Sequence, residues 1–193
     1  MKTKNILLTT VLLISGLLSV NGVFAETPGP TSSIQSADVK VNIIFTPIQT
    51  ITVNADASGV DINYTDKVHY ASGTFTEIDN HLNVYSTGGF TVSVLSEAEF
   101  TSTNTKSTPI PATDVKVLVR GTAVEGSLSF NEVALGTTGG DLIISQKGGS
   151  NLSYDITYNN TSEVTDRYID KYIADDEGQS VYSAVVTYSI NPS

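Results

Sequence analysis

The sequence contains no cysteine and no tryptophan, and only two histidines and one methionine among its 193 residues. Without cysteine the chain cannot form disulfides, zinc–thiolate sites, iron–sulfur clusters or a cysteine nucleophile. Basic side chains are also scarce, because 10 Lys and Arg stand against 20 Asp and Glu, which gives a net charge of −10. This balance argues against nucleic acid or an anionic membrane surface as a partner.

Residues 1–25 have the pattern of a secretory signal peptide. Two lysines precede an apolar run over Ile6–Val20, and small residues lead up to Ala25. The alternative is a membrane anchor, because the apolar run approaches the roughly 20 residues that span a bilayer. We expect cleavage between Ala25 and Glu26, and therefore a secreted protein that is not inserted in the membrane after cleavage.

Cleavage at this position makes the protein more acidic. Removal of 25 residues with two lysines leaves 168 residues, with 8 basic against 20 acidic side chains and a net charge of −12. Residues 26–38 are rich in Pro, Gly, Ser and Thr, and are expected to form a flexible N-terminal arm. We expect residues 39–193 to form a single domain, since this length can bury an adequate core without disulfides.

From Val39 onward apolar and polar residues alternate with a period of two, which is typical of half-buried β-strands. Gly, Asn, Asp and Pro separate the alternating runs. This pattern predicts an all-β, antiparallel, immunoglobulin-like β-sandwich. The expected strands are 39–45, 51–53, 60–64, 82–86, 90–94, 115–119, 128–130, 142–144, 152–158 and 182–190.

One stretch departs from this alternation. Over 163–174 apolar residues recur about four apart, which favours one short helix, although a strand with an irregular loop remains the alternative. The segment ends in the acidic run 175–177, with Asp166 and Asp170 nearby. These carboxylates could bind calcium, but the regular ligand spacing is missing, so we expect a solvated acidic loop.

The chain lacks an assembled catalytic set. There is no G-x-S-x-G, H-E-x-x-H or Walker motif. His69 and His81 lie in polar surroundings without a nucleophile or carboxylate at a motif spacing, and we expect both on the surface. We therefore expect no enzyme and no cofactor or metal.

Tyrosine is the abundant aromatic residue, with nine in the chain. Four of them have the spacing of residues that share a face on two C-terminal strands: Tyr154, Tyr158, Tyr182 and Tyr188. Two interpretations stand. An exposed face would bind sugars by stacking, whereas a buried face would fill the core and place its hydroxyls at the rim.

Two segments resemble secreted bacterial pilin subunits. The first is Gly88–Val94 (GGFTVSV), followed by a polar stretch, Ile110-Pro111-Ala112 and Val115-Lys116-Val117. The second is the closing segment Gly178–Ile190 (GQSVYSAVVTYSI). With the signal peptide and the N-terminal arm, these segments resemble the archaic chaperone–usher pilins, including the spore-coat-U-like group.

The resemblance implies a sandwich that lacks one strand, whose gap is filled by the N-terminal extension of the next subunit. The donor would be Ile34 to Ile43, with Ile34, Val39, Val41 and Ile43 as plugs. The partners would be like subunits and a periplasmic chaperone and usher, and the product an adhesive cell-surface fimbria. The alternatives are that 39–45 is the first strand of a complete sandwich, and that the protein is a stand-alone secreted module binding carbohydrate or protein.

Overall fold

A computed structural model describes residues 35–54, 59–121, 127–173 and 178–193. The expected cleavage site at Ala25 and Glu26, and the expected plug Ile34, lie outside these residues. The chain divides into two units, residues 1–43 and residues 44–193. In the first unit, residues 35–43 are exposed and belong to no helix or strand.

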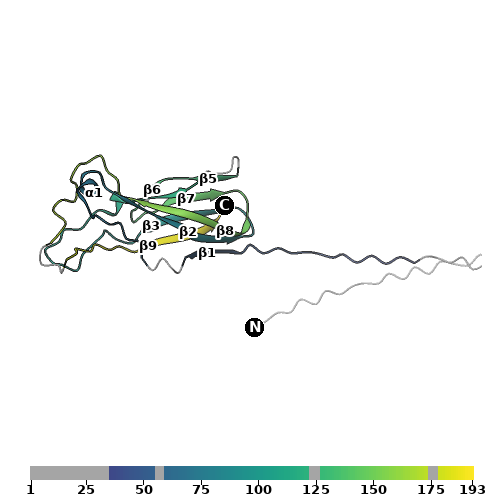
Figure 1. The fold of residues 1–193 in the computed structure, drawn as a ribbon. Helices are drawn as coiled ribbons and strands as arrows, with labels where there is room; N and C mark the ends of the chain where they lie inside the picture. Colours follow the sequence, from purple (N-terminus) through teal and green to yellow (C-terminus); the bar gives the residue numbers. More distant parts are fainter. Residues whose placement is uncertain (1–34, 55–58, 122–126, 174–177) are drawn as a thin grey trace, which may run out of the picture. The chain divides into compact units, whose positions relative to one another are not determined.

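Two antiparallel sheets make up the second unit (Figure 1). Sheet A contains, in spatial order, β1 (Gln49–Val53), β2 (Phe75–Ser86), β8 (Gly149–Asn159), β4 (Lys116–Arg120) and β6 (Val133–Ala134). Sheet B contains β5 (Leu128–Phe130), β7 (Gly140–Ser145), β3 (Phe90–Ser96) and β9 (Val186–Pro192). The sequence-based prediction of an all-β antiparallel sandwich is confirmed.

The chain changes sheet at every step from β2 to β9. In the immunoglobulin order, by contrast, some consecutive strands such as D and E are neighbours in the same sheet. All the strand pairs are antiparallel in either case, so the period-two pattern specifies the sandwich but not the order of its strands.

The core lies between the two sheets and follows the predicted alternation. In β3, Phe90, Val92 and Val94 are buried, while the residues between them are partly exposed. From sheet A, Leu82 and Ile156 meet the same cluster. Burial of an apolar side chain of this size contributes roughly 1.5–3 kcal/mol, so the alternation is the main source of stability.

Some expected strands differ from the observed ones. Residues 39–45 and 60–64 form no strand, so the first strand of the sandwich is β1 and not 39–45. Even so, Val60 and Ile62 are partly buried against the core. At the C-terminus, β9 begins at Val186, four residues after the predicted start, because the preceding residues form a single bridge between Ser183 and Thr101.

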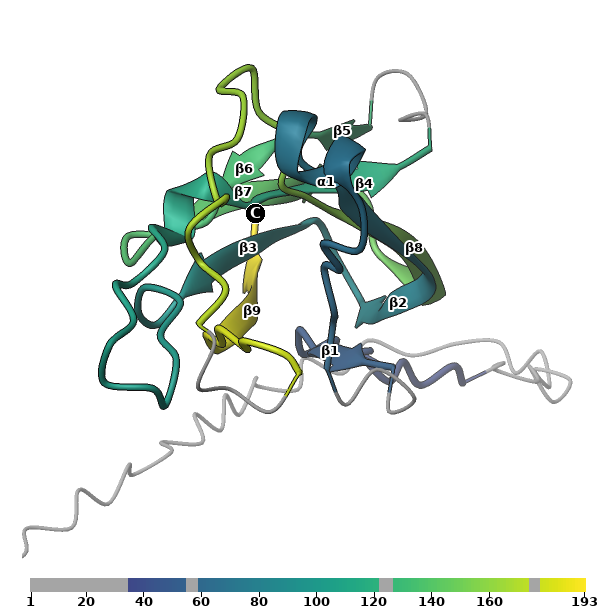
Figure 2. The same ribbon diagram turned by 60° about the vertical axis from the view of Figure 1, so that its left-hand side comes forward.

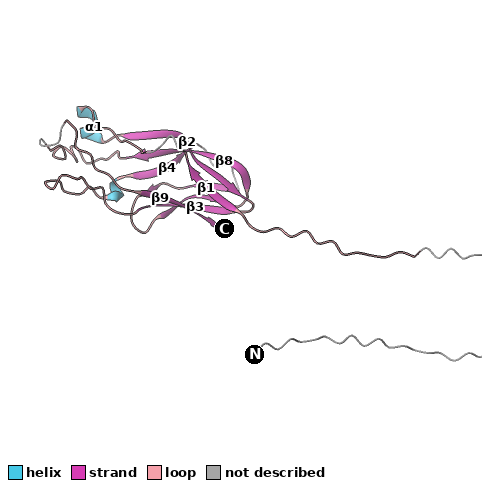
Figure 3. Ribbon diagram, turned by 90° about the horizontal axis from the view of Figure 1, so that it is seen from below, coloured by secondary structure: helices cyan, strands magenta, loops and turns pink. Residues whose placement is uncertain are grey.

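The short helix lies elsewhere than predicted. The described part of 163–174 contains turns and no helix, and Asp166 there has φ of +56°, a value that interrupts helical geometry. The α-helix is α1 (Lys67–Ser72), at one end of the sandwich (Figure 3). Asp66 caps its N-terminus by accepting from the backbone N–H groups of Val68 and His69, and Gly73 with φ of +79° ends it. A 3-10 turn spans Ala112–Asp114.

None of the helices in the described residues is long and apolar enough to cross a membrane.

Candidate functional site

The segment Val39–Phe45 is the most apolar exposed part of the described chain. Val39, Val41, Ile43 and Phe45 alternate with Lys40, Asn42 and Ile44, and the side chains of Val39 and Phe45 are 84% and 89% exposed. Isolated exposed apolar side chains are normal, but a continuous alternating run marks a segment that gains stability when it pairs with a sheet.

A short tether joins this segment to the sandwich. The backbone N–H of Ile48 donates to the Thr87 hydroxyl at 2.9 Å, and the N–H of Thr87 donates to the carbonyl of Ile48 at 3.0 Å. Only Thr46 and Pro47 lie between Phe45 and this anchor. Ile48 therefore fixes the point at which the segment leaves the sandwich, beside the turn that joins β2 to β3.

Sheet A has an incomplete edge next to β1. β1 pairs with β2 only over Leu82–Ser86, and a backbone hydrogen bond of 2.8 Å from Asn54 to the carbonyl of His81 ends the pairing. No described strand pairs with Phe75–Asn80 on this side. Residues 59–64 pass beside this part of β2 on the way to α1 (Figure 2), where the Thr76 hydroxyl donates to the carbonyl of Asp61 at 2.6 Å.

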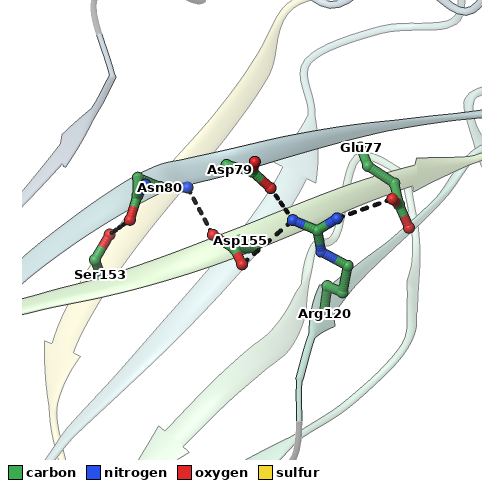
Figure 4. Close-up of polar contacts among 6 residues, drawn as sticks. All are labelled: Glu77, Asp79, Asn80, Arg120, Ser153 and Asp155. Atoms are coloured by element: carbon green, nitrogen blue, oxygen red, sulfur yellow. Dashed lines mark hydrogen bonds and ion pairs between the residues drawn. The ribbon is translucent and has the colours of Figure 1, made fainter.

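An acidic cluster lies on the outer face of sheet A next to this edge (Figure 4). The guanidinium of Arg120 contacts Glu77 at 2.9 Å, Asp155 at 3.3 Å and also Asp79. Three carboxylates share one guanidinium, so the cluster has a net charge of −2 when all groups are ionised. These side chains come from β2, β8 and β4, three neighbouring strands.

Hydrogen bonds hold the cluster in place. The backbone N–H of Asn80 donates to Asp155 at 2.7 Å, and the Ser153 hydroxyl donates to the Asn80 side chain at 2.8 Å. The Asn80 hydrogen bond, together with Arg120, lowers the pKa of Asp155. The hydrogen bond that Arg120 donates to Asp155 raises the pKa of Arg120 in turn.

A bulge in β2 explains the position of His81. Ile78 pairs with Ile156 and Leu82 with Tyr154, so three residues of β2 lie opposite the single residue Asp155. The bulge turns both His81 and Leu82 into the core. The sequence-based prediction of a surface position for His81 is therefore wrong, because the bulge places His81 in the core in spite of its polar neighbours in the sequence.

His81 takes part in a polar chain that crosses the core. Its Nε2 lies 3.0 Å from the Tyr158 hydroxyl, which lies 2.7 Å from the Tyr188 hydroxyl. Within the described residues Nδ1 of His81 is buried without a hydrogen-bond partner. Burial lowers the pKa of His81, raises that of Tyr158 to about 12, and raises that of Tyr188 further.

The four predicted ligand-binding tyrosines do not form an exposed aromatic face. Tyr154 and Tyr158 are buried, and Tyr188 is half-buried. Tyr182 lies before β9, where its hydroxyl donates to the carbonyl of Lys171 at 3.1 Å. Tyr154, Tyr158 and Tyr188 thus pack in or against the core, as in the second interpretation, but the hydroxyls of Tyr158 and Tyr188 bond to each other and do not lie at the rim.

A second polar network braces the long connection between β8 and β9. Asp114 is buried and accepts from the guanidinium of Arg167 and, at 2.7 Å, from the hydroxyl of Tyr168. The Asn160 side chain donates to the carbonyl of Asp114 at 2.9 Å and accepts from the hydroxyl of Tyr64. Burial raises the pKa of Tyr64 to about 12.

The braced connection carries exposed carboxylates in its described part. Asp166 and Asp170 are exposed, whereas residues 175–177 lie outside the description. Across the described segments, no three His, Asp or Glu side chains are grouped so as to hold a metal ion. His69 of α1 is half-buried, and its Nδ1 accepts from the backbone N–H of Thr65 at 3.2 Å.

No family model matches the chain. A search of curated proteins also found no match.

Proposed function

We propose that this protein is an exported, non-enzymatic subunit of a bacterial cell-surface fimbria, and that its copies associate by β-strand addition through residues 39–45. The observation that carries the proposal is the alternation of apolar side chains over Val39–Phe45 together with their exposure. An added strand pairs its backbone with a sheet edge and buries alternate side chains.

Two further observations support the proposal. The first 25 residues have the pattern of a signal peptide, which would deliver the protein outside the cytoplasm. The sandwich is built without cysteine, so its stability depends on the core and on strand pairing. A periplasmic chaperone and an usher would protect the apolar segment before assembly, and adhesion would follow from display on the cell surface.

The test is the size of the mature protein, residues 26–193, measured by light scattering over a range of concentrations. We expect oligomers or filaments in the intact chain and monomers after deletion of residues 26–45. Circular dichroism provides the control that the shortened chain still folds. A stable monomer in both cases would contradict the proposal.

A stand-alone binding module is the second candidate, and one observation favours it. The connection between β8 and β9 spans residues 160–185, a length that is unusual for a loop without a binding role. It exposes Val164, Ile169 and Tyr172 on a segment braced by Asp114. Loss of binding to a glycan or protein array upon Tyr172→Ala, in a protein that stays monomeric, would support this candidate.

A further inference from the structure

Residues 60–64 occupy the position of a missing strand without forming one. They run beside the unpaired part of β2, and Val60 and Ile62 pack against the core. A hydrogen bond from the Thr76 hydroxyl to the carbonyl of Asp61 joins the segment to β2. The segment therefore covers the core at this edge but provides no ladder of backbone hydrogen bonds.

The exposed segment near the N-terminus has a similar sequence. Residues 39–43 read V-K-V-N-I and residues 60–64 read V-D-I-N-Y. Both alternate three apolar side chains with two polar ones, and both have Val first and Asn fourth. The clear difference is the second position, where Lys40 corresponds to Asp61.

The charge difference favours Lys40 at this edge. Asp61 runs beside a strand that carries Glu77 and Asp79, in a cluster with a net charge of −2. A negative residue at this place is repelled by the cluster, whereas a lysine is attracted to it. Residues 39–43 therefore complement the charge of this edge better than residues 60–64, which cover it in the structure.

We propose that residues 39–43 of a second copy pair with the Phe75–Asn80 edge of β2 and replace residues 60–64 there. This inference rests on the proposed function and names the surface that receives the added strand. Val39, Val41 and Ile43 take the inward positions of Val60, Ile62 and Tyr64, and Lys40 lies beside Glu77.

The direction of the chain then determines the arrangement of the copies. Residues 60–64 run from β1 towards α1, and the replacing segment runs the same way. Its last residues are therefore next to the α1 end of the receiving copy. Since only residues 44–47 separate Ile43 from the anchor at Ile48, the second sandwich begins within about 17 Å of that end. Repetition of this contact is heterologous and gives an open, head-to-tail row of copies.

A charge exchange tests the receiving edge. The double variant Glu77→Lys with Asp79→Lys should lower the affinity between copies at least tenfold, and mixing it with a Lys40→Glu variant should restore association to within a few-fold of that of the intact chain. The matched control is Glu132→Lys, an exposed carboxylate paired with Lys116 at the far edge of sheet A, which should leave association unchanged. Failure of Lys40→Glu to restore association in a folded protein would overturn the inference.

The absence of cysteine permits a direct test of contact. Lys40→Cys in one copy should form a disulfide with Glu77→Cys in another under mild oxidation. Equally exposed partners at the other sheet edges, Ser129→Cys on β5 and Ser189→Cys on β9, should not react. Reaction at β5 or β9 instead would overturn the inference and leave the proposed function standing. Absence of reaction with all three, in a chain that remains monomeric, would contradict both.

Hydrogen exchange of the intact chain tests the same contact between copies without any substitution. On assembly of the intact chain, amides of residues 39–43 and the outward amides of Phe75–Asn80 should become protected at least tenfold, because the added strand supplies the backbone hydrogen bonds that residues 60–64 do not. Unchanged exchange over residues 75–80 in assembled protein would show that the added strand lies at another edge.

Discussion

The hydroxyl groups of Tyr158 and Tyr188 lie 2.7 Å apart and join the two sheets of the sandwich across its core. Tyr158 comes from β8 in sheet A and Tyr188 from β9 in sheet B. Tyr158 also reaches His81, so a single hydroxyl connects the bulge in β2 to the last strand. The polar chain therefore links the irregular part of one sheet to an edge strand of the other.

The two tyrosines should differ in their importance for stability. Tyr188→Phe leaves the Tyr158 hydroxyl bonded to His81, and should lower the free energy of unfolding by about 1 kcal/mol. Tyr158→Phe leaves both ring nitrogens of His81 buried without partners, and should cost about 2–3 kcal/mol. Urea unfolding of the two variants gives this order directly, and a larger loss for Tyr188→Phe would contradict the assigned chain.

Stability should fall between pH 7.5 and pH 5.5 because of His81. Burial lowers the pKa of His81 in the folded state below its ordinary value of about 6.5. The unfolded chain therefore binds the proton first, and the free energy of unfolding decreases as the pH falls through 6.5 towards the folded pKa, by about 1 kcal/mol for each unit between the two. Urea unfolding of the intact chain and of His81→Phe at both pH values tests this. An equal pH effect in the variant would show that another group is responsible.

The connection between β8 and β9 should become more flexible when its interactions with the Asp114 carboxylate are removed. Asp114→Asn removes the carboxylate that holds Arg167 and Tyr168, and should cost about 2 kcal/mol. Hydrogen exchange of residues 160–173 should accelerate more than exchange in β3. The matched variant Tyr168→Phe removes the hydroxyl that donates to Asp114 and accepts from Asn160, but leaves Arg167 paired with Asp114, and should have a smaller effect. Uniform acceleration throughout the sandwich would instead indicate a global loss of stability.

The Arg120 cluster should make stability depend on salt. Arg120→Met leaves Glu77, Asp79 and Asp155 together without a cation, so their repulsion should lower the melting temperature. All these side chains are exposed, and salt screens such interactions over about 10 Å at 0.1 M. The difference in melting temperature from the intact chain should therefore shrink between 20 mM and 500 mM NaCl, and a difference independent of salt would argue for lost packing.

The fold class could be predicted from the sequence because alternation survives in most strands. Phe90, Val92 and Val94 are buried as their spacing predicts. The position of His81 could not be predicted, because the bulge depends on Asn80 at φ of +51° and on its bond to Asp155, which is 75 residues away. The order of the strands in each sheet could not be predicted either, because the apolar pattern of a strand does not indicate which strands pair with it.

The sequence contains local signals for the helix, because Asp66 and Gly73 stand at the two ends of α1 as its N-cap and its C-terminal stop. The apolar spacing over 163–174 predicts a helix in a segment that turns at Asp166 instead. The candidate site was predicted only in part. Alternation singled out Val39, Val41 and Ile43, but a charged edge formed by Glu77, Asp79 and Arg120 arises only when three strands come together.

The central claim is that residues 39–45 hold copies of this protein together, and sedimentation velocity of the mature chain tests it most directly. Ile43→Asp places a charge among the alternating apolar side chains and should convert assemblies to monomers, at least a tenfold loss of affinity. Val164→Asp, at an exposed apolar position outside the segment, should leave the assemblies intact. Assemblies that persist in the Ile43→Asp variant, or an intact chain that sediments as a monomer at every concentration, would contradict the account.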